Sequence, residues 1–220
     1  MTSSVLVVST DPQGSTVWWA DRVGEGLPFD YTQAHDDPRS LATLSTLDAQ
    51  VHVIANQKGG AGKTTIVMNL AAVVQEALGE APAYRHVFID TPGSLEDERL
   101  LAASLEVAHD VIVPLPPEPL AFDPTARTIS QVIKPRELPF RVVVNNWDPR
   151  DGRADLDETL DYIDAQGWPR TKKPVRRYKL HTRASAEGQV VTQYRKNRVS
   201  LEARLDFLEL ALELGYGGGA

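Results

Sequence analysis

The chain has 220 residues, 42% of them hydrophobic, which suits one globular domain with a sizeable core. Its net charge is -7, and it contains no cysteine, which excludes disulfides, thiolate zinc sites and cysteine-ligated iron–sulfur clusters. It has no apolar run of about 18 residues and no signal-peptide pattern, so we expect a cytoplasmic protein without a membrane span.

The first fifty residues begin with a short apolar run at residues 5–8, which predicts a buried strand. We expect a short helix over residues 15–22. Residues 24–38 are predicted to be a loop, because glycines and prolines interrupt them. A second short helix is expected over residues 40–47.

The remainder of the chain alternates short apolar runs with helical patterns. Residues 51–55 predict a strand that enters a glycine-rich loop, and a helix should follow over residues 63–78. Further strands are expected at residues 86–89, 111–113 and 141–145, and further helices at residues 95–108, 125–133, 156–166 and 201–214. This alternation predicts an α/β fold with a mainly parallel sheet covered by helices on both faces, and a flexible tail at residues 215–220.

A phosphate-binding motif lies between the strand at residues 51–55 and the following helix. Its glycines let the backbone wrap around phosphates, and the helix N-terminus offers free N–H groups. Lys63 places a cation on the outer phosphates, and the Thr64 hydroxyl can ligate magnesium. We therefore expect ATP and magnesium to bind, rather than a glycine turn that binds nothing. The residues expected at the nucleotide are Lys58, Gly59, Gly60, Ala61, Gly62, Lys63, Thr64 and Thr65.

Two aspartates follow predicted strands. Asp90 precedes Thr-Pro-Gly, and its carboxylate can hold magnesium through water while the glycine lets the backbone follow the γ-phosphate. An ordinary strand-end turn is the alternative. Asp11 precedes Pro-Gln-Gly-Ser, where the alternative to a catalytic carboxylate is a turn or helix-cap residue.

The run from Lys58 to Thr65 resembles the deviant Walker A motif of the ParA/MinD ATPases, and the resemblance extends over nearly the whole chain. It is closest to small ParA-type partition ATPases. It implies a three-layer P-loop NTPase fold and an ATP-sandwich homodimer, in which Lys58 reaches the phosphates of the partner subunit. The Asp90 segment looks like Walker B and switch II. The Asp11 segment looks like switch I and implies that Asp11 orients the attacking water, although Ser9 replaces the first aspartate of that motif.

The same resemblance suggests two segments near the base of the nucleotide. Asn145 and Asn146 end the last predicted strand, where related proteins contact the base, and the proline-rich residues 116–119 resemble a segment near the nucleotide. A strand-end turn is the alternative for both.

The order of the segments differs from that of the family. The switch I block, residues 5–50, precedes the phosphate-loop block, residues 51–80, while residues 84–214 keep their usual place. Two consecutive blocks are thus exchanged, which is not a circular permutation; a natural and an engineered origin both stay open. In the family's sheet, the strand at residues 86–89 would lie between those at 5–8 and 51–55. The altered joints should then fall at the N-terminal edge of the sheet, so the exchange should preserve the site at the opposite edge.

Residues 170–204 form a basic segment. They carry eleven of the 23 basic residues and two acids, a local balance of +9 within an acidic chain. A nucleic-acid phosphate backbone is attracted by such a local basic patch, whatever the net charge of the chain. The segment resembles the family's C-terminal region, which binds DNA without sequence preference; a solvated charged surface is the alternative. The candidate DNA contacts are Arg176, Arg177, Lys179, Arg195, Lys196 and Arg198.

The last predicted helix carries leucines at positions 201, 205, 208 and 212, and it is acidic after Arg204. A membrane-surface helix needs a basic polar face, so this one is predicted to pack its leucines on the core and to bind no membrane.

Together these features predict a weakly hydrolysing partition ATPase that dimerises with ATP and associates with the nucleoid through nonspecific DNA. A centromere-bound partner protein would stimulate it. The ATPase would segregate plasmid or chromosome DNA. The alternatives are a positioning ATPase for a protein or membrane cargo, a metabolic ligase or reductase on the same fold, and a rearranged scaffold with impaired switching. The reductase form would need cluster cysteines, and the ligase form an added substrate pocket.

Overall fold

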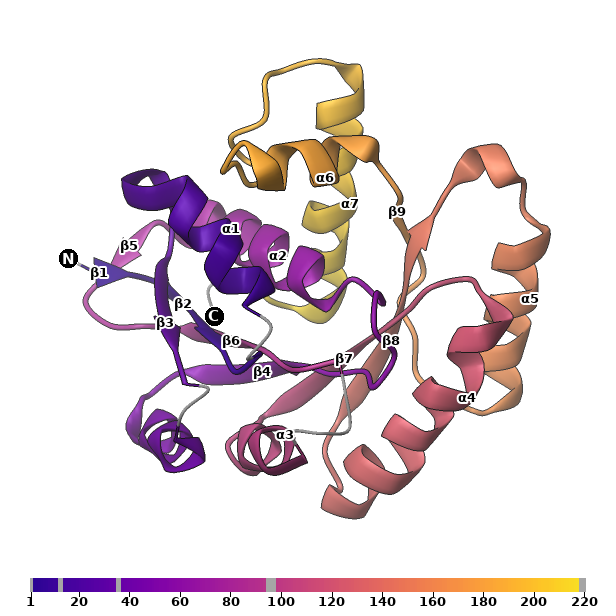
Figure 1. The fold of residues 1–220 in the computed structure, drawn as a ribbon, viewed down its shortest axis with the longest axis horizontal. Helices are drawn as coiled ribbons and strands as arrows, with labels where there is room; N and C mark the ends of the chain where they lie inside the picture. Colours follow the sequence, from indigo (N-terminus) through magenta and orange to yellow (C-terminus); the bar gives the residue numbers. More distant parts are fainter. Residues whose placement is uncertain (1, 12–13, 35–36, 94–97, 218–220) are drawn as a thin grey trace.

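The computed structural model describes residues 2–11, 14–34, 37–93 and 98–217. A seven-stranded sheet forms its centre, in the order β3-β2-β6-β4-β7-β8-β9, and every neighbouring pair of strands is parallel (Figure 1). The strands are β2 (Val5–Ser9), β3 (Asp30–Gln33), β4 (Gln50–Ile54), β6 (His86–Asp90), β7 (Asp110–Leu115), β8 (Phe140–Trp147) and β9 (Val175–Arg176). A separate antiparallel pair joins β1 (Thr2–Ser3) to β5 (Glu80–Ala81).

Helices cover both faces of the sheet, as predicted (Figure 1). One face carries α1 (Ser15–Val23), α2 (Lys63–Leu78), α6 (Lys179–Ala186) and α7 (Arg198–Leu214). The other carries the 3-10 helix η2 (Pro38–Thr46), α3 (Glu98–Glu106), α4 (Pro119–Arg127) and α5 (Ala154–Ala165). Helix α4 continues into a π-helical turn at Thr128–Ile133 and a 3-10 turn at Lys134–Arg136, and shorter 3-10 turns occur at Gly24–Gly26 and Pro149–Asp151.

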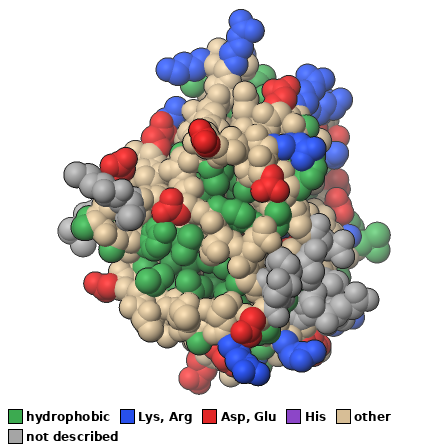
Figure 2. Space-filling model, turned by 60° about the vertical axis from the view of Figure 1, so that its left-hand side comes forward, with side chains coloured by type: hydrophobic (Ala, Val, Ile, Leu, Met, Phe, Trp, Pro, Cys, Tyr) green, Lys and Arg blue, Asp and Glu red, His purple; other side chains and the backbone are tan. Residues whose placement is uncertain are grey.

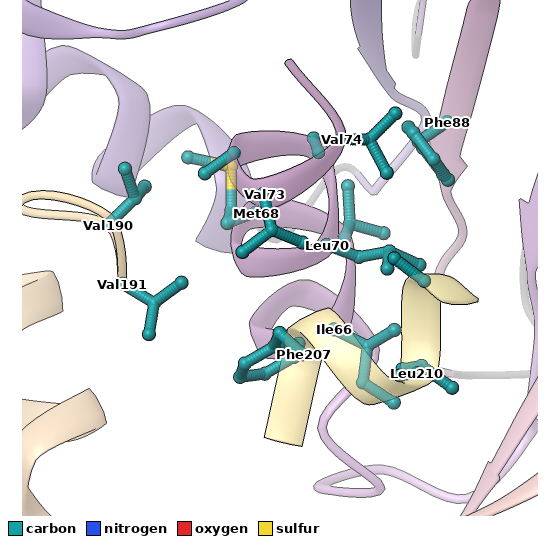
Figure 3. Packing of buried hydrophobic residues seen from close by; sticks show 14 of the residues in the cluster. Ile66, Met68, Leu70, Val73, Val74, Phe88, Val190, Val191, Phe207 and Leu210 are labelled. Carbon is teal, nitrogen blue, oxygen red and sulfur yellow. The ribbon is translucent and has the colours of Figure 1, made fainter. Parts of the chain in front are cut away.

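Two apolar clusters fill the spaces on either side of the sheet. Alternate residues of one strand enter different clusters: Val5 and Val7 pack under α2, whereas Leu6 and Val8 pack toward η2. This division follows from the two-residue period of a strand buried on both faces. In the first cluster, Phe207 of α7 packs beside α2, as Figure 3 shows. Helix α2 is therefore buried along most of its length.

Strand β6 lies between β2 and β4 and is hydrogen-bonded to both. Ser9 and Ile54 are both in register with Asp90, so the C-terminal ends of the three strands meet at one edge of the sheet. This is the arrangement expected from the exchanged blocks. It brings the loops that follow β2, β4 and β6 to a common edge, where ligands bind in open α/β sheets.

The structure corrects the predicted loop at residues 24–38, because β3 lies within it as an edge strand beside β2. Its sequence, Asp-Tyr-Thr-Gln, is mostly exposed and has no apolar run to reveal it. The expected helix at 125–133 begins earlier, at Pro119, since proline is tolerated in a helix's first turn. The expected 95–108 helix is seen as α3, and residues 94–97 lie outside the described part. Strand β9 and helix α6, both in the basic segment, were not predicted.

The last helix packs on the core, but the prediction for its leucines is wrong. Its buried apolar side is formed by Ala203, Phe207, Leu210 and Ala211. Leu201, Leu205 and Leu212 are instead 54%, 48% and 69% exposed. The helix carries two apolar stripes, and the one richest in leucine faces solvent. Among the described residues, no helix is both long and apolar enough to cross a membrane.

Candidate functional site

The glycine-rich loop connects β4 to α2 at the C-terminal edge of the sheet. Gly62 has a positive φ of 85°, and a side chain there would collide with the amide of Asn145, so both backbone and space demand glycine. The Nδ2 of Asn145 donates to the Ala61 carbonyl at 2.8 Å. This asparagine thus holds the loop from the end of β8.

Asn56 anchors the start of the same loop, a role that sequence reasoning missed. Its Nδ2 donates to the Pro114 carbonyl at 2.7 Å and to the Thr125 hydroxyl at 2.8 Å. Its Oδ1 accepts from the Lys58 backbone N–H at 2.9 Å. One buried amide therefore ties the loop to both β7 and α4, which fixes the backbone that would surround phosphates.

Asp90 lies at the end of β6 and is completely buried. Its Oδ2 accepts a hydrogen bond from the Thr64 hydroxyl at 2.8 Å and another from the Thr16 hydroxyl. Its Oδ1 has no hydrogen-bond partner among the described residues. Burial raises the pKa of Asp90 to about 6, against the opposing effect of the two hydroxyls and of Lys63. The carboxylate is thus held in a place that favours its protonated form.

Lys63 is the first residue of α2, and its side chain is also buried. Its Nζ donates to the Asn56 carbonyl at 3.1 Å. Burial lowers the pKa of Lys63, while Asp90 and Asp11 act in the opposite direction. A Cβ on Gly93 would lie 3.1 Å from this Nζ, so the Asp-Thr-Pro-Gly segment runs directly beside the phosphate loop.

Asp11 faces the same space as Lys63 and is 8% exposed. Helix α1 begins after Gly14, which is its N-cap residue. The backbone N–H of Gly14 donates to the Asp11 carbonyl at 3.0 Å. Thr16, one turn further on, reaches Asp90 as described above, a contact that the sequence did not reveal.

A cavity of about 840 Å³ opens between these elements, within the size range of small-molecule sites. Its described walls are Asp11, Gly14, Ser15, Trp18, Trp19, Gly59, Gly60, Gly62, Lys63, Thr64, Thr65, Gly93 and Ser185. Lys58 is half-buried and is not among them. Six of the eight predicted loop residues therefore meet Asp11 and Gly93 around one space.

A second cavity of about 360 Å³ adjoins the first, and the two share Trp19, Gly60, Gly62, Thr65 and Ser185. Asn145, Asn146 and Tyr178 line it, together with residues of α6. Residues 116–119 line neither cavity. Asn146 therefore lies beside the loop as expected, while Asn145 is already engaged with Ala61.

The oxygen donors of Thr64, in the wall of the first cavity, and of the fully buried Asp90 fit magnesium. The Thr64 hydroxyl and the Asp90 carboxylate are oxygen donors, which this hard cation prefers. The Oδ1 of Asp90 is a buried acceptor without a hydrogen-bond partner among the described residues. No cluster of three or more His, Cys, Asp or Glu residues suited to a metal occurs in the described part of the chain. A magnesium ion would thus need oxygens from the phosphates as well as from these two side chains.

The basic segment is partly neutralised by ion pairs. Arg176 contacts Asp206 at 2.6 Å and also approaches Glu202, so it joins β9 to α7. Arg198 pairs with Glu202 at 2.9 Å. Six exposed cations form no ion pair with any described residue: Lys172, Arg177, Lys179, Arg183, Arg195 and Lys196. Figure 2 shows Lys and Arg side chains projecting at the top of the molecule, at the height of the α6–α7 connection in Figure 1.

Comparison with known proteins places these features in context. The family model described as the CobQ/CobB/MinD/ParA nucleotide binding domain matches residues 52–192. A "Maintenance of carboxysome distribution protein A" from Gloeobacter kilaueensis is 30% identical over 210 residues, which span 96% of this chain and 80% of that protein.

Solved structures with low sequence identity share the fold. Apo McdA from Cyanothece superposes with a TM-score of 0.57 at 11% identity, over 97% of this chain and 88% of that one. A putative plasmid partition protein from Borrelia burgdorferi, bound to AMPPNP, superposes with a TM-score of 0.54 at 13% identity, over 96% and 87% of the two chains. At these identities the likeness concerns the α/β fold alone.

Proposed function

Because the chain belongs to the CobQ/CobB/MinD/ParA family of nucleotide-binding domains, we propose that it is a magnesium-dependent ATPase that positions a cargo by switching between monomer and ATP-bound dimer. The observation that carries the proposal is the pair of buried charged groups at the phosphate loop, Lys63 in the cavity wall and the fully buried Asp90 beside Thr64. The carboxyl of Asp90 has a raised pKa and the ammonium of Lys63 a lowered one. Each group already has the other as an opposite charge, but burial outweighs that attraction, and phosphates and magnesium would supply the further opposite charge.

The roles of the site residues follow from their positions. Backbone N–H groups from Gly59 to Thr65 bind the phosphates at the helix N-terminus, and Lys63 neutralises their outer oxygens. Thr64 and Asp90 hold magnesium, which when bound supplies positive charge to the phosphate oxygens. Asp11, on the opposite wall, orients the attacking water.

Lys58 acts across the dimer in this proposal. Its position outside the walls of its own cavity supports a role on the phosphates of the partner subunit. Sheet-edge sites of two subunits would then face each other, and hydrolysis would release them.

Nonspecific DNA is the surface to which the ATP-bound dimer is proposed to bind. The exposed cations of the basic segment support it, chiefly Arg195 and Lys196 at the α6–α7 connection. The ion pair of Arg176 with Asp206 makes that residue a weaker candidate than its sequence context suggested. Base readout is not needed, since phosphate contacts alone supply nonspecific affinity.

Two cargoes are compatible with such a switch. The 30% identical relative is named for carboxysome distribution, which favours a protein assembly as the cargo. Segregation of plasmid or chromosome DNA through a centromere-bound protein is the second candidate, supported by the resemblance to small partition ATPases. In both cases the partner stimulates hydrolysis.

The test is the molecular mass of the protein in solution, with and without Mg-ATP and DNA. At low protein concentration we expect the 24.2 kDa monomer alone and a dimer on addition of Mg-ATP. Asp11→Ala should prolong the dimer, because slower hydrolysis leaves ATP bound. ADP is the matched control ligand and should leave a monomer. A mass that saturating Mg-ATP does not change would contradict the switch.

A further inference from the structure

Helix α7 presents, on its side away from α2, an apolar stripe that is mostly exposed; of its leucines, Leu208 also packs against the core. The inward side, around Phe207, packs with α2. The outward side consists of Leu201, Leu205, Leu208 and Leu212. Three of these are about half exposed or more, at 54%, 48% and 69%, and Leu208 is half-buried. On a helix of 3.6 residues per turn, these four positions fall in one line opposite the buried side.

The spacing of the four leucines is that of a coiled-coil seam. The steps between them are four, three and four residues, which is the d-a-d-a order of a heptad repeat. Scattered exposed leucines need no explanation, but a continuous line of them at heptad spacing is typical of a helix that pairs with another helix.

The charges beside this seam indicate its occupant. In the same heptad frame, Arg204 occupies a g position, and Glu202 and Glu209 occupy e positions. In a parallel pair of helices, the g residue of one faces the following e residue of the other. Arg204 would therefore face Glu209 of a second copy, twice by symmetry. An antiparallel pair would instead set e against e and bring the two glutamates together.

We propose that the outward stripe of α7 is a self-association surface, which pairs in parallel with α7 of a second copy of this chain. Acidic side chains beside the seam oppose an anionic membrane, which would repel them. None of the four leucines lines the nucleotide cavity. The contact is thus independent of ATP and separate from the ATP-dependent dimer proposed above.

This contact is expected to be weak. The seam covers one face of a single helix, well below the roughly 1,200–2,000 Å² of a standard interface. Arg204 and Glu209 also have partners within the chain, Glu76 and Lys173, which they would share or exchange. Two chains already joined by ATP would present two such stripes, so ATP dimers should associate more readily through bivalency.

The first experiment is sedimentation equilibrium without nucleotide. The average mass of the wild type should rise above 24.2 kDa with concentration, whereas Leu205→Glu and Leu212→Glu should remain at 24.2 kDa. Leu120→Glu is the matched control, since Leu120 is 82% exposed but lies on α4. Thermal melts should be nearly unchanged, because all three side chains are exposed. A wild type that stays monomeric at the highest concentration overturns the proposal.

A charge exchange tests the parallel register. Arg204→Glu alone and Glu209→Arg alone each set like charges against each other in a homodimer, so each should associate roughly tenfold more weakly than the wild type. Mixing the two variants restores both opposite-charge pairs and should restore association. Because each change also removes an internal ion pair, melts of the single variants check that they remain folded. If the mixture stays monomeric, or if either variant alone associates like the wild type, the parallel pairing is wrong.

Discussion

Replacing Asp90 by asparagine should raise the free energy of unfolding, relative to the wild type, more at pH 7.5 than at pH 4 in the ligand-free protein. The same change should remove the magnesium dependence of nucleotide binding. Burial raises the pKa of this carboxyl from 3.8 to about 6. Below pH 3.8 the folded and unfolded chains both hold the proton. Between pH 3.8 and about 6 the unfolded chain loses it first, so folding becomes less favourable as the pH rises.

The magnitude follows from that shift. At about 1.36 kcal/mol per pKa unit, the ionised carboxylate costs about 3 kcal/mol of stability above pH 6. Asparagine carries no charge and still offers an acceptor to the Thr16 and Thr64 hydroxyls. Its NH2 group would lie where Oδ1 now has no partner, at a cost of about 1–2 kcal/mol. That cost is the same at every pH. Because the unfolded carboxyl is already more than half ionised at pH 4, the difference between the two pH values should be about 2.5 kcal/mol.

Urea unfolding of the wild type and of Asp90→Asn at pH 4 and pH 7.5 measures this difference directly. Titrations of groups that do not interact with Asp90 occur in both proteins and cancel. Asp161→Asn, an exposed acidic position on α5, is the matched substitution without burial. A variant whose free energy of unfolding, relative to the wild type, is the same at both pH values would refute the reasoning. Calorimetry on the same protein should find ATP binding that no longer responds to magnesium.

Four further outcomes are expected. Lys63→Ala should abolish Mg-ATP binding in calorimetry, and undiminished binding would remove the phosphate-loop assignment. Lys58→Ala should bind ATP but fail to dimerise or turn over; normal dimers would make it an ordinary loop lysine. Alanines at Arg195 and Lys196 should weaken binding to two unrelated duplexes equally and reduce the slope of log affinity against log salt by about 0.9 for each phosphate that is no longer neutralised, without affecting ATP binding; a change confined to one duplex argues against phosphate contacts. Burial lowers the pKa of His181 to about 4, so the folded protein resists a proton that the unfolded chain accepts below pH 6.5; the free energy of unfolding of the wild type relative to His181→Asn should therefore fall by up to about 3 kcal/mol from pH 6.5 to 4 in urea unfolding.

The parts of the fold that the sequence predicted are those with a local signal. Helix α2 and the central strands combine apolar runs with clear breakers, and their positions are confirmed. Strand β3 has no such signal, since it is polar, exposed and defined by its pairing with β2. Helix α7 shows another limit: it has two apolar stripes, and periodicity alone cannot say which one faces the core. The side that packs closely on α2 contains two alanines, which a leucine-rich pattern conceals.

The candidate site divides in the same way. Its predicted phosphate loop is a contiguous motif, so its residues could be proposed from the sequence, and six of them line the cavity. Thr16 and Asn56 were missed because their contacts join distant parts of the chain: Thr16 meets Asp90 across 74 positions, and Asn56 meets Thr125 across 69. Arg176 was included among DNA contacts because its acid partner, Asp206, is 30 positions away. Only the folded arrangement reveals such pairs.

The central place of β6 bears on how the chain is made. This strand joins β2 to β4, yet both of them leave the ribosome before it does. Until His86–Asp90 has been synthesised, the two N-terminal blocks have no strand between them and cannot share one sheet. Their buried valines and isoleucines therefore stay open to solvent during that interval, a state in which nascent chains aggregate or engage chaperones. Synthesis of about the first ninety residues, rather than of the first block, marks the point at which this half of the sheet can close.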